Sequence, residues 1–195
     1  MVITMKERAD PDEKQQVNSR QEFFWGCLPF VTTPTEVVNR MLELARVTAS
    51  DVVMDLGCGD GRILMAALEK YGARMAIGYE IREDLVKVAR ELFDSKDLGE
   101  RVRLMKGDLL EADLSEASVI AIYLTGTGNQ RLRSKFEDEA KPGTRIVSHG
   151  YGVEGWKPAI VDGVTGNKIF LYEVPGAFKQ EDNKLPAQKW LRFWA

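Results

Sequence analysis

Cysteine and histidine are scarce in this sequence, which has two Cys and one His among 195 residues. Cys27 and Cys58 cannot build the disulfide framework of a small secreted domain, and they favour a reducing compartment. A structural zinc site takes about four Cys or His ligands at short spacings, so we expect no metal site. The expected location of the protein is the cytoplasm.

Long apolar runs and an excess of positive charge are also absent. No stretch approaches the ~20 apolar residues that cross a bilayer, so we expect no membrane span. Residues 1–16 mix acids with bases, unlike a secretory signal or a transit peptide. Lys+Arg total 27 against 30 Asp+Glu, without the basic excess of a dedicated nucleic-acid binder, so no nucleic-acid partner is expected. The 44% hydrophobic content is enough for one core, which predicts one domain, and we expect a monomer.

Composition divides the chain into three parts. Residues 1–22 form a polar N-terminal tail, residues 23–175 contain the predicted domain, and residues 176–195 are a C-terminal extension. The extension ends in KWLRFWA, whose aromatic side chains either cover an edge of the sheet or contact a partner or a membrane. We favour the sheet edge.

Strand-like and helix-like segments alternate within the domain. Short apolar runs predict strands at 51–57, 75–80, 101–108, 117–124 and 144–149. Apolar periodicity predicts helices at 33–47, 61–72, 82–93 and 129–140. This alternation indicates crossover connections and a parallel sheet. Only TGN separates the last two strand-like runs, 159–164 and 168–174, and so short a link allows only an antiparallel hairpin. The predicted fold is α/β, a Rossmann-like open sheet of seven strands that is mostly parallel and ends in this hairpin.

The helix at 33–47 has a recognisable start. Thr33 is its predicted cap, Pro34 suits the first helical position and Glu36 completes a Thr-x-x-Glu capping box. Apolar residues between Val37 and Ala45 then recur at helical spacing and give the helix a buried face.

The stretch VVMDLGCGDGR, residues 52–62, joins the first predicted strand to a helix. Gly57 and Gly59 let backbone amides approach a ligand closely, beside the partial positive charge of a helix start. Dinucleotide enzymes use Gly-x-Gly-x-x-Gly at such a loop, but Arg62 stands where the third glycine belongs. Asp55, two residues before the first glycine, suits a cationic ligand such as S-adenosylmethionine and suits the diphosphate of NAD badly.

Acidic residues end three successive predicted strands. Asp55 closes the first strand, and Glu80 closes the second, at about the distance where an acid binds ribose hydroxyls. Asp108 closes the third and is placed to accept a hydrogen bond from the exocyclic amine of adenine, with Leu109 against the ring. Each acid alone can be a loop or cap residue. Together, at neighbouring strand ends, they predict a site for S-adenosylmethionine.

Over residues 30–175 the sequence resembles the class I S-adenosylmethionine-dependent methyltransferases, whose seven-stranded sheet ends in an antiparallel hairpin. The segments CLPFVTTPTEVV, DLGCGDGR, LRSKFEDEAKPGTRIVSH and GWKP make it similar to two groups. These are the archaeal broad-specificity protein lysine methyltransferases and the mitochondrial lysine methyltransferases of the ATP synthase c subunit and adenine nucleotide translocase. The resemblance implies methyl transfer to lysine side chains of protein substrates. It places cofactor contacts at Asp55, Gly57, Gly59, Glu80 and Asp108, and it places Thr33 near the methionine end of the cofactor.

Candidate catalytic residues follow the fourth and fifth strands. Tyr123 either walls the methyl acceptor or packs in the core. Asn129 either orients the acceptor amine through its carbonyl oxygen or caps the helix that begins there. His149 either accepts a proton or is simply hydrogen-bonded in place, and Trp156 either walls the acceptor entrance or packs a loop. No dedicated base is required, because a poorly hydrated channel beside a sulfonium disfavours the charged form of a lysine amine.

Other activities remain compatible with the fold. A small-molecule or RNA methyltransferase shares it, and residues 125–129, TGTGN, replace a bulky apolar residue that close relatives often have beside the acceptor. A protein that binds the cofactor without transferring a methyl group is the alternative outside the enzymes. The chain lacks the Asn/Asp-Pro-Pro-Tyr/Phe motif of many enzymes that methylate base amines, and its glycine spacing disfavours an oxidoreductase.

Overall fold

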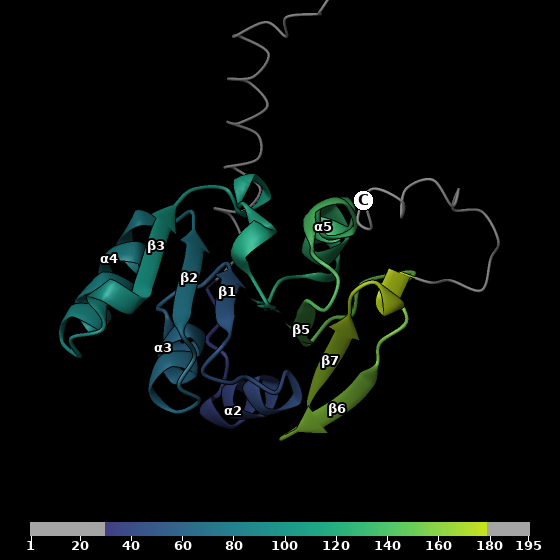
Figure 1. Ribbon diagram of the computed structural model, residues 1–195, viewed down its shortest axis with the longest axis horizontal. Helices are drawn as coiled ribbons and strands as arrows, with labels where there is room; N and C mark the ends of the chain where they lie inside the picture. Colours follow the sequence, from purple (N-terminus) through teal and green to yellow (C-terminus); the bar gives the residue numbers. More distant parts are fainter. Residues whose placement is uncertain (1–29, 179–195) are drawn as a thin grey trace, which may run out of the picture.

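The computed structural model describes residues 30–178, which form one seven-stranded sheet in the order β3-β2-β1-β4-β5-β7-β6 (Figure 1). The strands are β1 (Val52–Leu56), β2 (Met75–Glu80), β3 (Val102–Lys106), β4 (Val119–Ile122), β5 (Arg145–His149), β6 (Ile160–Val164) and β7 (Asn167–Glu173). The first five strands pair in parallel, and β7 runs antiparallel to both β5 and β6. The predicted α/β fold, with its C-terminal antiparallel hairpin, is confirmed.

Helices cover both faces of this sheet. The α-helices are α2 (Thr35–Leu44), α3 (Arg62–Glu69), α4 (Glu83–Asp94) and α5 (Gly126–Glu139). Val53, Ala121 and Val147 share one hydrophobic cluster with residues of α2, α3 and α4. Met54, Ile120 and Ile146 belong to a second cluster with Leu132 and Phe136 of α5, and Figure 1 shows α2 and α5 on opposite sides of the sheet. Because β1 and β4 are buried on both faces, every residue in them is shielded from solvent, as predicted by the uniformly apolar sequence of β4 and by that of β1 apart from Asp55.

The start of α2 differs from the prediction. The helix begins at Thr35 with Pro34 as its N-cap, and no side chain caps it, so the predicted capping box of Thr33 and Glu36 is wrong. Two distant residues bind Thr33 instead. Its carbonyl oxygen accepts a hydrogen bond from Arg62 Nη1 at 3.0 Å, and its hydroxyl lies 3.4 Å from His149 Nδ1. These tertiary contacts place Thr33 outside the helix.

Helix α5 begins three residues earlier than predicted. Thr125 is the N-cap, and its hydroxyl accepts a hydrogen bond from Gly128 N at 3.1 Å. The alternative in which Asn129 caps this helix is therefore wrong, because Asn129 already lies in the first helical turn. Glycines at 126 and 128 have low helix propensity and hid this turn in the sequence.

The ends of the domain are only partly described. The predicted N-terminal tail at 1–22, Cys27 and the aromatic segment KWLRFWA lie outside residues 30–178. After β7, a short 3₁₀ helix (Gly176–Phe178) buries Ala177 and Phe178, so buried residues continue past position 175. None of the helices in the described part of the chain is both long and apolar enough to cross a membrane.

Gly78, in the middle of β2, is packed too closely to accept a side chain. A Cβ atom there would lie 2.7 Å from both Cys58 Sγ and Leu64 Cδ1, and 3.0 Å from Leu104 Cδ2. We expect Gly78→Ala to lower the free energy of unfolding by about 1–3 kcal/mol, because an added methyl group overpacks the core. Urea unfolding measures this. Gly176→Ala is the control, since no heavy atom lies within 4 Å of its Cβ position. An equal free energy for wild type and Gly78→Ala would contradict the packing described here.

Candidate active site

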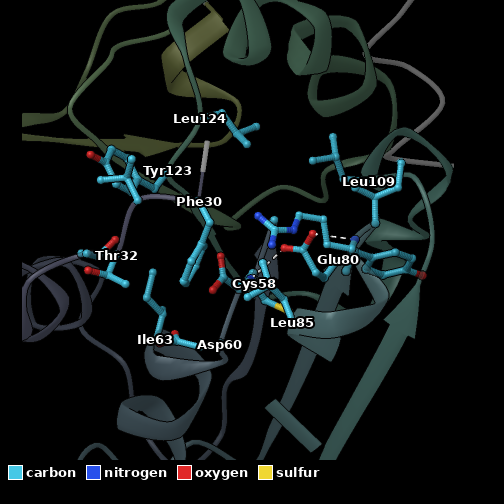
Figure 2. A pocket seen from close by; sticks show the side chains of 18 of the residues that line it. Phe30, Thr32, Cys58, Asp60, Ile63, Glu80, Leu85, Leu109, Tyr123 and Leu124 are labelled. Carbon is cyan, nitrogen blue, oxygen red and sulfur yellow. Dashed lines mark hydrogen bonds between the residues drawn. The ribbon is translucent and has the colours of Figure 1, made fainter. Parts of the chain in front are cut away.

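A pocket of about 300 Å³ opens at the carboxyl ends of β1, β2 and β4. Such a position, where parallel strands of an open sheet end, is typical of ligand sites in this architecture. Figure 2 shows Glu80 and Leu109 toward one end of the pocket and Tyr123 and Thr32 toward the other, with Phe30 between them. We refer to these as the Glu80 end and the Tyr123 end.

The glycine loop after β1 is held against β2. The amides of Gly57 and Cys58 both donate to the Tyr79 carbonyl oxygen, at 2.9 and 3.0 Å, and the Gly59 amide donates to Glu80 Oε2 at 2.9 Å. These amide donors face the sheet, while Gly57 and Gly59 both line the pocket, so their contact with the cofactor stays a prediction. The glycines are needed for another reason. Gly59 has a φ of +54°, and a Cβ atom there would collide with the Phe30 ring, inside the pocket.

Glu80 is fixed by two backbone amides. Its Oε2 accepts from Gly59 N and its Oε1 accepts from Arg82 N, each at 2.9 Å. The side chain is buried yet lines the pocket, so its orientation is set before any ligand binds. A carboxylate held in this way at the end of the second strand retains lone pairs for ligand hydroxyl groups.

Asp108 is a helix cap, one of the two roles that the sequence left open, and its second carboxyl oxygen is left over for the other. Its Oδ1 caps a short 3₁₀ helix (Leu109–Glu111) by accepting from Leu110 N at 2.8 Å. Its Oδ2 is buried and has no hydrogen-bond partner among the described residues. Gly107 and Leu109 on either side both line the pocket. A buried acceptor oxygen without a donor is costly, which indicates that a ligand supplies the missing donor.

Asp55 is a buried carboxyl group that lines the pocket. Burial, followed by the nearby negative charges of Glu80 and Asp60, raises the pKa of Asp55 to about 8. A positively charged ligand would relieve this unfavourable cluster of acids. The neighbouring Cys58 is not a nucleophile, because burial raises the pKa of its thiol well above the usual range.

The Tyr123 end is built around a buried histidine. His149 Nε2 lies 3.0 Å from Asn167 Oδ1, and the amide nitrogen of Asn167 contacts Thr165, so Nε2–H is the donor. His149 Nδ1 then accepts from the Thr33 hydroxyl at 3.4 Å. The Tyr123 ring stacks on the imidazole with centroids 3.8 Å apart. Thr33 and Tyr123 line the pocket, whereas His149 supports both from behind.

Comparison with known proteins identifies the family to which a chain with this pocket belongs. A family model described as the ANTKMT methyltransferase domain matches residues 55–160, more than half of the chain. The protein-lysine N-methyltransferase of Saccharolobus islandicus (strain REY15A) is 40% identical over 75% of this chain and 94% of that protein. The chain belongs to the ANTKMT methyltransferase family.

Two further relatives of this methyltransferase carry different names. The adenine nucleotide translocase lysine N-methyltransferase of Mus musculus is 31% identical over 77% of this chain, and the match spans 65% of the mouse protein. The crystal structure of an RNA methyltransferase from Salinibacter ruber in complex with S-adenosyl-L-homocysteine is 41% identical, with a TM-score of 0.74. The similarity covers 78% of this chain and 98% of that one.

The methyltransferase uses S-adenosylmethionine, and the Glu80 end fits that cofactor. Glu80 is positioned to accept hydrogen bonds from the ribose hydroxyls, and Asp108 Oδ2 can accept one from a donor such as the adenine amine. Leu109 supplies an apolar surface beside it. The ammonium and sulfonium charges of the cofactor would favour the ionised form of Asp55. Thr33 contacts His149 near the Tyr123 end, and its place beside the methionine portion of the cofactor stays a prediction.

Two predicted catalytic residues of the methyltransferase lie behind the pocket wall. His149 is 1% exposed, and burial lowers its pKa, so the imidazole is neutral and does not touch the pocket. Asn129 is fully buried as well. Neither side chain lines the pocket, unlike Tyr123. The alternative in which His149 is simply hydrogen-bonded in place agrees with its contacts to Thr33 and Asn167.

Sequence reasoning missed several lining residues. Phe30, Arg62 and Tyr151 all line the pocket. The apolar residues that precede Thr33 gave some indication of Phe30, because an apolar segment is expected to pack against the rest of the domain. No local pattern distinguishes Tyr151, which follows a glycine beyond β5. Trp156 takes the packing role, buried with Phe178 at a 4.6 Å centroid distance.

Proposed function

We propose that this methyltransferase transfers methyl groups to lysine side chains of proteins. The charge distribution of the pocket carries the proposal. Asp55, Asp60 and Glu80 line it, and its two lining arginines are already paired. Arg62 binds Asp60 at 2.5 Å and Arg82 binds Asp84 at 2.6 Å. With both lining arginines paired, the lining offers little to a phosphate group, which favours an amine acceptor over a nucleic acid.

The residues at the Tyr123 end support an amine as the acceptor. S-adenosylmethionine, when bound, supplies a methyl group on a positively charged sulfur. A lysine amine must reach it neutral, although its ordinary pKa is about 10.4. Phe30, Tyr123 and Leu124 line the pocket with apolar surface, and apolar surroundings disfavour the ammonium form. The buried, neutral His149 adds no positive charge. Deprotonation is thus promoted by the surroundings without a dedicated base.

An RNA acceptor is the second candidate, because the relative from Salinibacter ruber is described as an RNA methyltransferase at 41% identity. Aromatic side chains at a pocket entrance can stack on nucleotide bases. The pairing of Arg62 and Arg82 with carboxylates weighs against this acceptor, since RNA binding depends on cations available to phosphates.

Radiolabelled S-adenosylmethionine and a cell extract distinguish the two acceptors. We expect label that protease releases and nuclease does not, and acid hydrolysis of the labelled protein should yield methylated lysine. Heat-inactivated enzyme is the control for background transfer. Label that only nuclease removes would replace the lysine proposal with the RNA one, and an absence of label in both fractions would favour a cofactor-binding protein without transfer.

A monomeric state and a cytoplasmic location complete the proposal. Its partners are protein substrates. Gel filtration with light scattering tests the first point, and fractionation of cells tests the second.

A further inference from the structure

Tyr151 is an exposed aromatic side chain at the pocket. It lines the pocket and is 53% exposed, although only Gly150 separates it from the end of strand β5. Its turn borders the Tyr123 end, because a Cβ atom on Gly150 would lie 3.4 Å from the Tyr123 ring. The Tyr151 ring itself lies against the start of α5, with Cδ1 3.8 Å from the Cβ position of Gly126. The ring therefore presents aromatic surface to the solvent at the edge of the pocket.

The backbone that carries Tyr151 is held unusually well. Its carbonyl oxygen accepts two hydrogen bonds, from Ser148 Oγ at 2.6 Å and from Asn129 Nδ2 at 2.8 Å. Its amide donates to the His149 carbonyl oxygen at 2.9 Å, and the Gly150 amide donates to Lys168 O at 2.8 Å. The backbone of this turn is therefore fixed by hydrogen bonds, which sets the place from which the Tyr151 ring reaches the pocket.

Asn129 is the main support of this turn from α5. Its Nδ2 also lies 3.2 Å from Ser148 Oγ and 3.3 Å from Gly152 O, so the two hydrogens of one buried NH₂ group are shared among three acceptors. Asn129 Oδ1 is buried without a hydrogen-bond partner among the described residues, so the side chain is held to the turn through Nδ2. Through Asn129, helix α5 thereby holds the turn that carries Tyr151 beside the pocket.

We propose that Tyr151 is an acceptor-binding residue that contacts the incoming lysine side chain, and that Asn129 is its positioning residue. This inference rests on the proposed function. An aromatic ring suits a lysine on approach, since its face attracts the ammonium group and its area covers the methylene stem. Phe30 and Tyr123, which line the same pocket, offer the amine further aromatic surface.

Substitutions of Tyr151 test the first half of the proposal. The acceptor is an unfractionated soluble protein extract titrated by mass, with saturating radiolabelled S-adenosylmethionine. We expect Tyr151→Ala to raise the apparent KM for the extract at least fivefold, and Tyr151→Phe to stay within twofold of wild type. Calorimetric affinity for S-adenosylhomocysteine should remain within twofold in both. Val161→Ala is the matched control, because Val161 is similarly exposed but lies on β6, away from the pocket.

A double-mutant cycle tests the second half. Asn129→Ala should raise the same apparent KM, and adding it to Tyr151→Ala should change that value by less than twofold, because Asn129 acts through Tyr151. A merely structural effect would multiply the two changes and lower the affinity for S-adenosylhomocysteine. Melting temperatures show whether each variant folds. If Asn129→Ala does not fold, the Tyr151 variants alone test the proposal.

The outcomes separate this inference from the function beneath it. Wild-type labelling of protein, with an apparent KM for Tyr151→Ala within twofold of wild type, overturns the role of Tyr151 and leaves the lysine proposal in place. Wild-type label that only nuclease removes overturns both. Protein labelling with a raised KM for Tyr151→Ala, rescued by Tyr151→Phe, supports both.

Discussion

Glu80→Ala is expected to weaken binding of S-adenosylmethionine at least tenfold. The substitution removes the carboxylate placed for the ribose, and it leaves the amides of Gly59 and Arg82 without their acceptor. The glycine loop then loses a bond to β2 in addition to the lost ligand contact. Isothermal titration calorimetry with the cofactor and with S-adenosylhomocysteine measures the change.

Two further variants make this result specific. Glu80→Gln keeps the shape of the side chain but turns an NH₂ group toward one of the two amide donors, so it should also bind the cofactor weakly. Glu83→Ala removes an exposed carboxylate that pairs with Lys87 and Lys106, and it should bind normally. Unchanged affinity in Glu80→Ala would remove Glu80 from the binding site.

Asp55→Asn should make the ligand-free protein more stable at pH 9 than the wild type. Burial and the charges of Glu80 and Asp60 raise the pKa of Asp55 to about 8, well above its ordinary value of 3.8. Between these two values the folded state binds more protons than the unfolded state, so this group lowers stability as pH rises. The slope is at most about 1.4 kcal/mol per pH unit. Asparagine stays neutral and removes that slope, and the difference in melting temperature between pH 5 and pH 9 measures it.

The same substitution should weaken cofactor binding. Ionised Asp55 attracts the ammonium and sulfonium groups, so the wild type binds more tightly as pH rises toward 8 and releases a proton on binding. Asp55→Asn loses this component, while titration of the ligand itself is common to both proteins and cancels in the comparison. Calorimetry in buffers of different ionisation enthalpy counts the protons. A variant that is less stable than wild type at pH 9 would show that Asp55 is not a strained acid.

Much of the fold and the cofactor end follows from local sequence. Apolar runs marked the strands, and a three-residue link marked the antiparallel hairpin, because both features depend on neighbouring residues. Asp55 and Glu80 were found for the same reason, since parallel strands bring their ends to one edge of the sheet. For Asp108 the sequence left a helix cap and a ligand contact open as alternatives. One of its carboxyl oxygens caps a 3₁₀ helix, and the other has no partner among the described residues.

The remaining features depend on contacts across the chain. Thr33 left its predicted cap position because residues 29 and 116 positions away bind it. The loop amides turned toward β2 because Tyr79 and Glu80 offered acceptors there, which no glycine spacing reveals. Asn129 looked like a helix cap, yet its partners lie in the turn after β5. Local patterns do not encode such pairings.

The bonds that tie Gly57, Cys58 and Gly59 to β2 also have a kinetic consequence. These bonds hold the loop in the ligand-free protein, so we expect cofactor entry to need no rearrangement of that segment. Uptake should therefore follow a single exponential whose rate constant grows linearly with cofactor concentration, without the plateau that a slow isomerisation would impose.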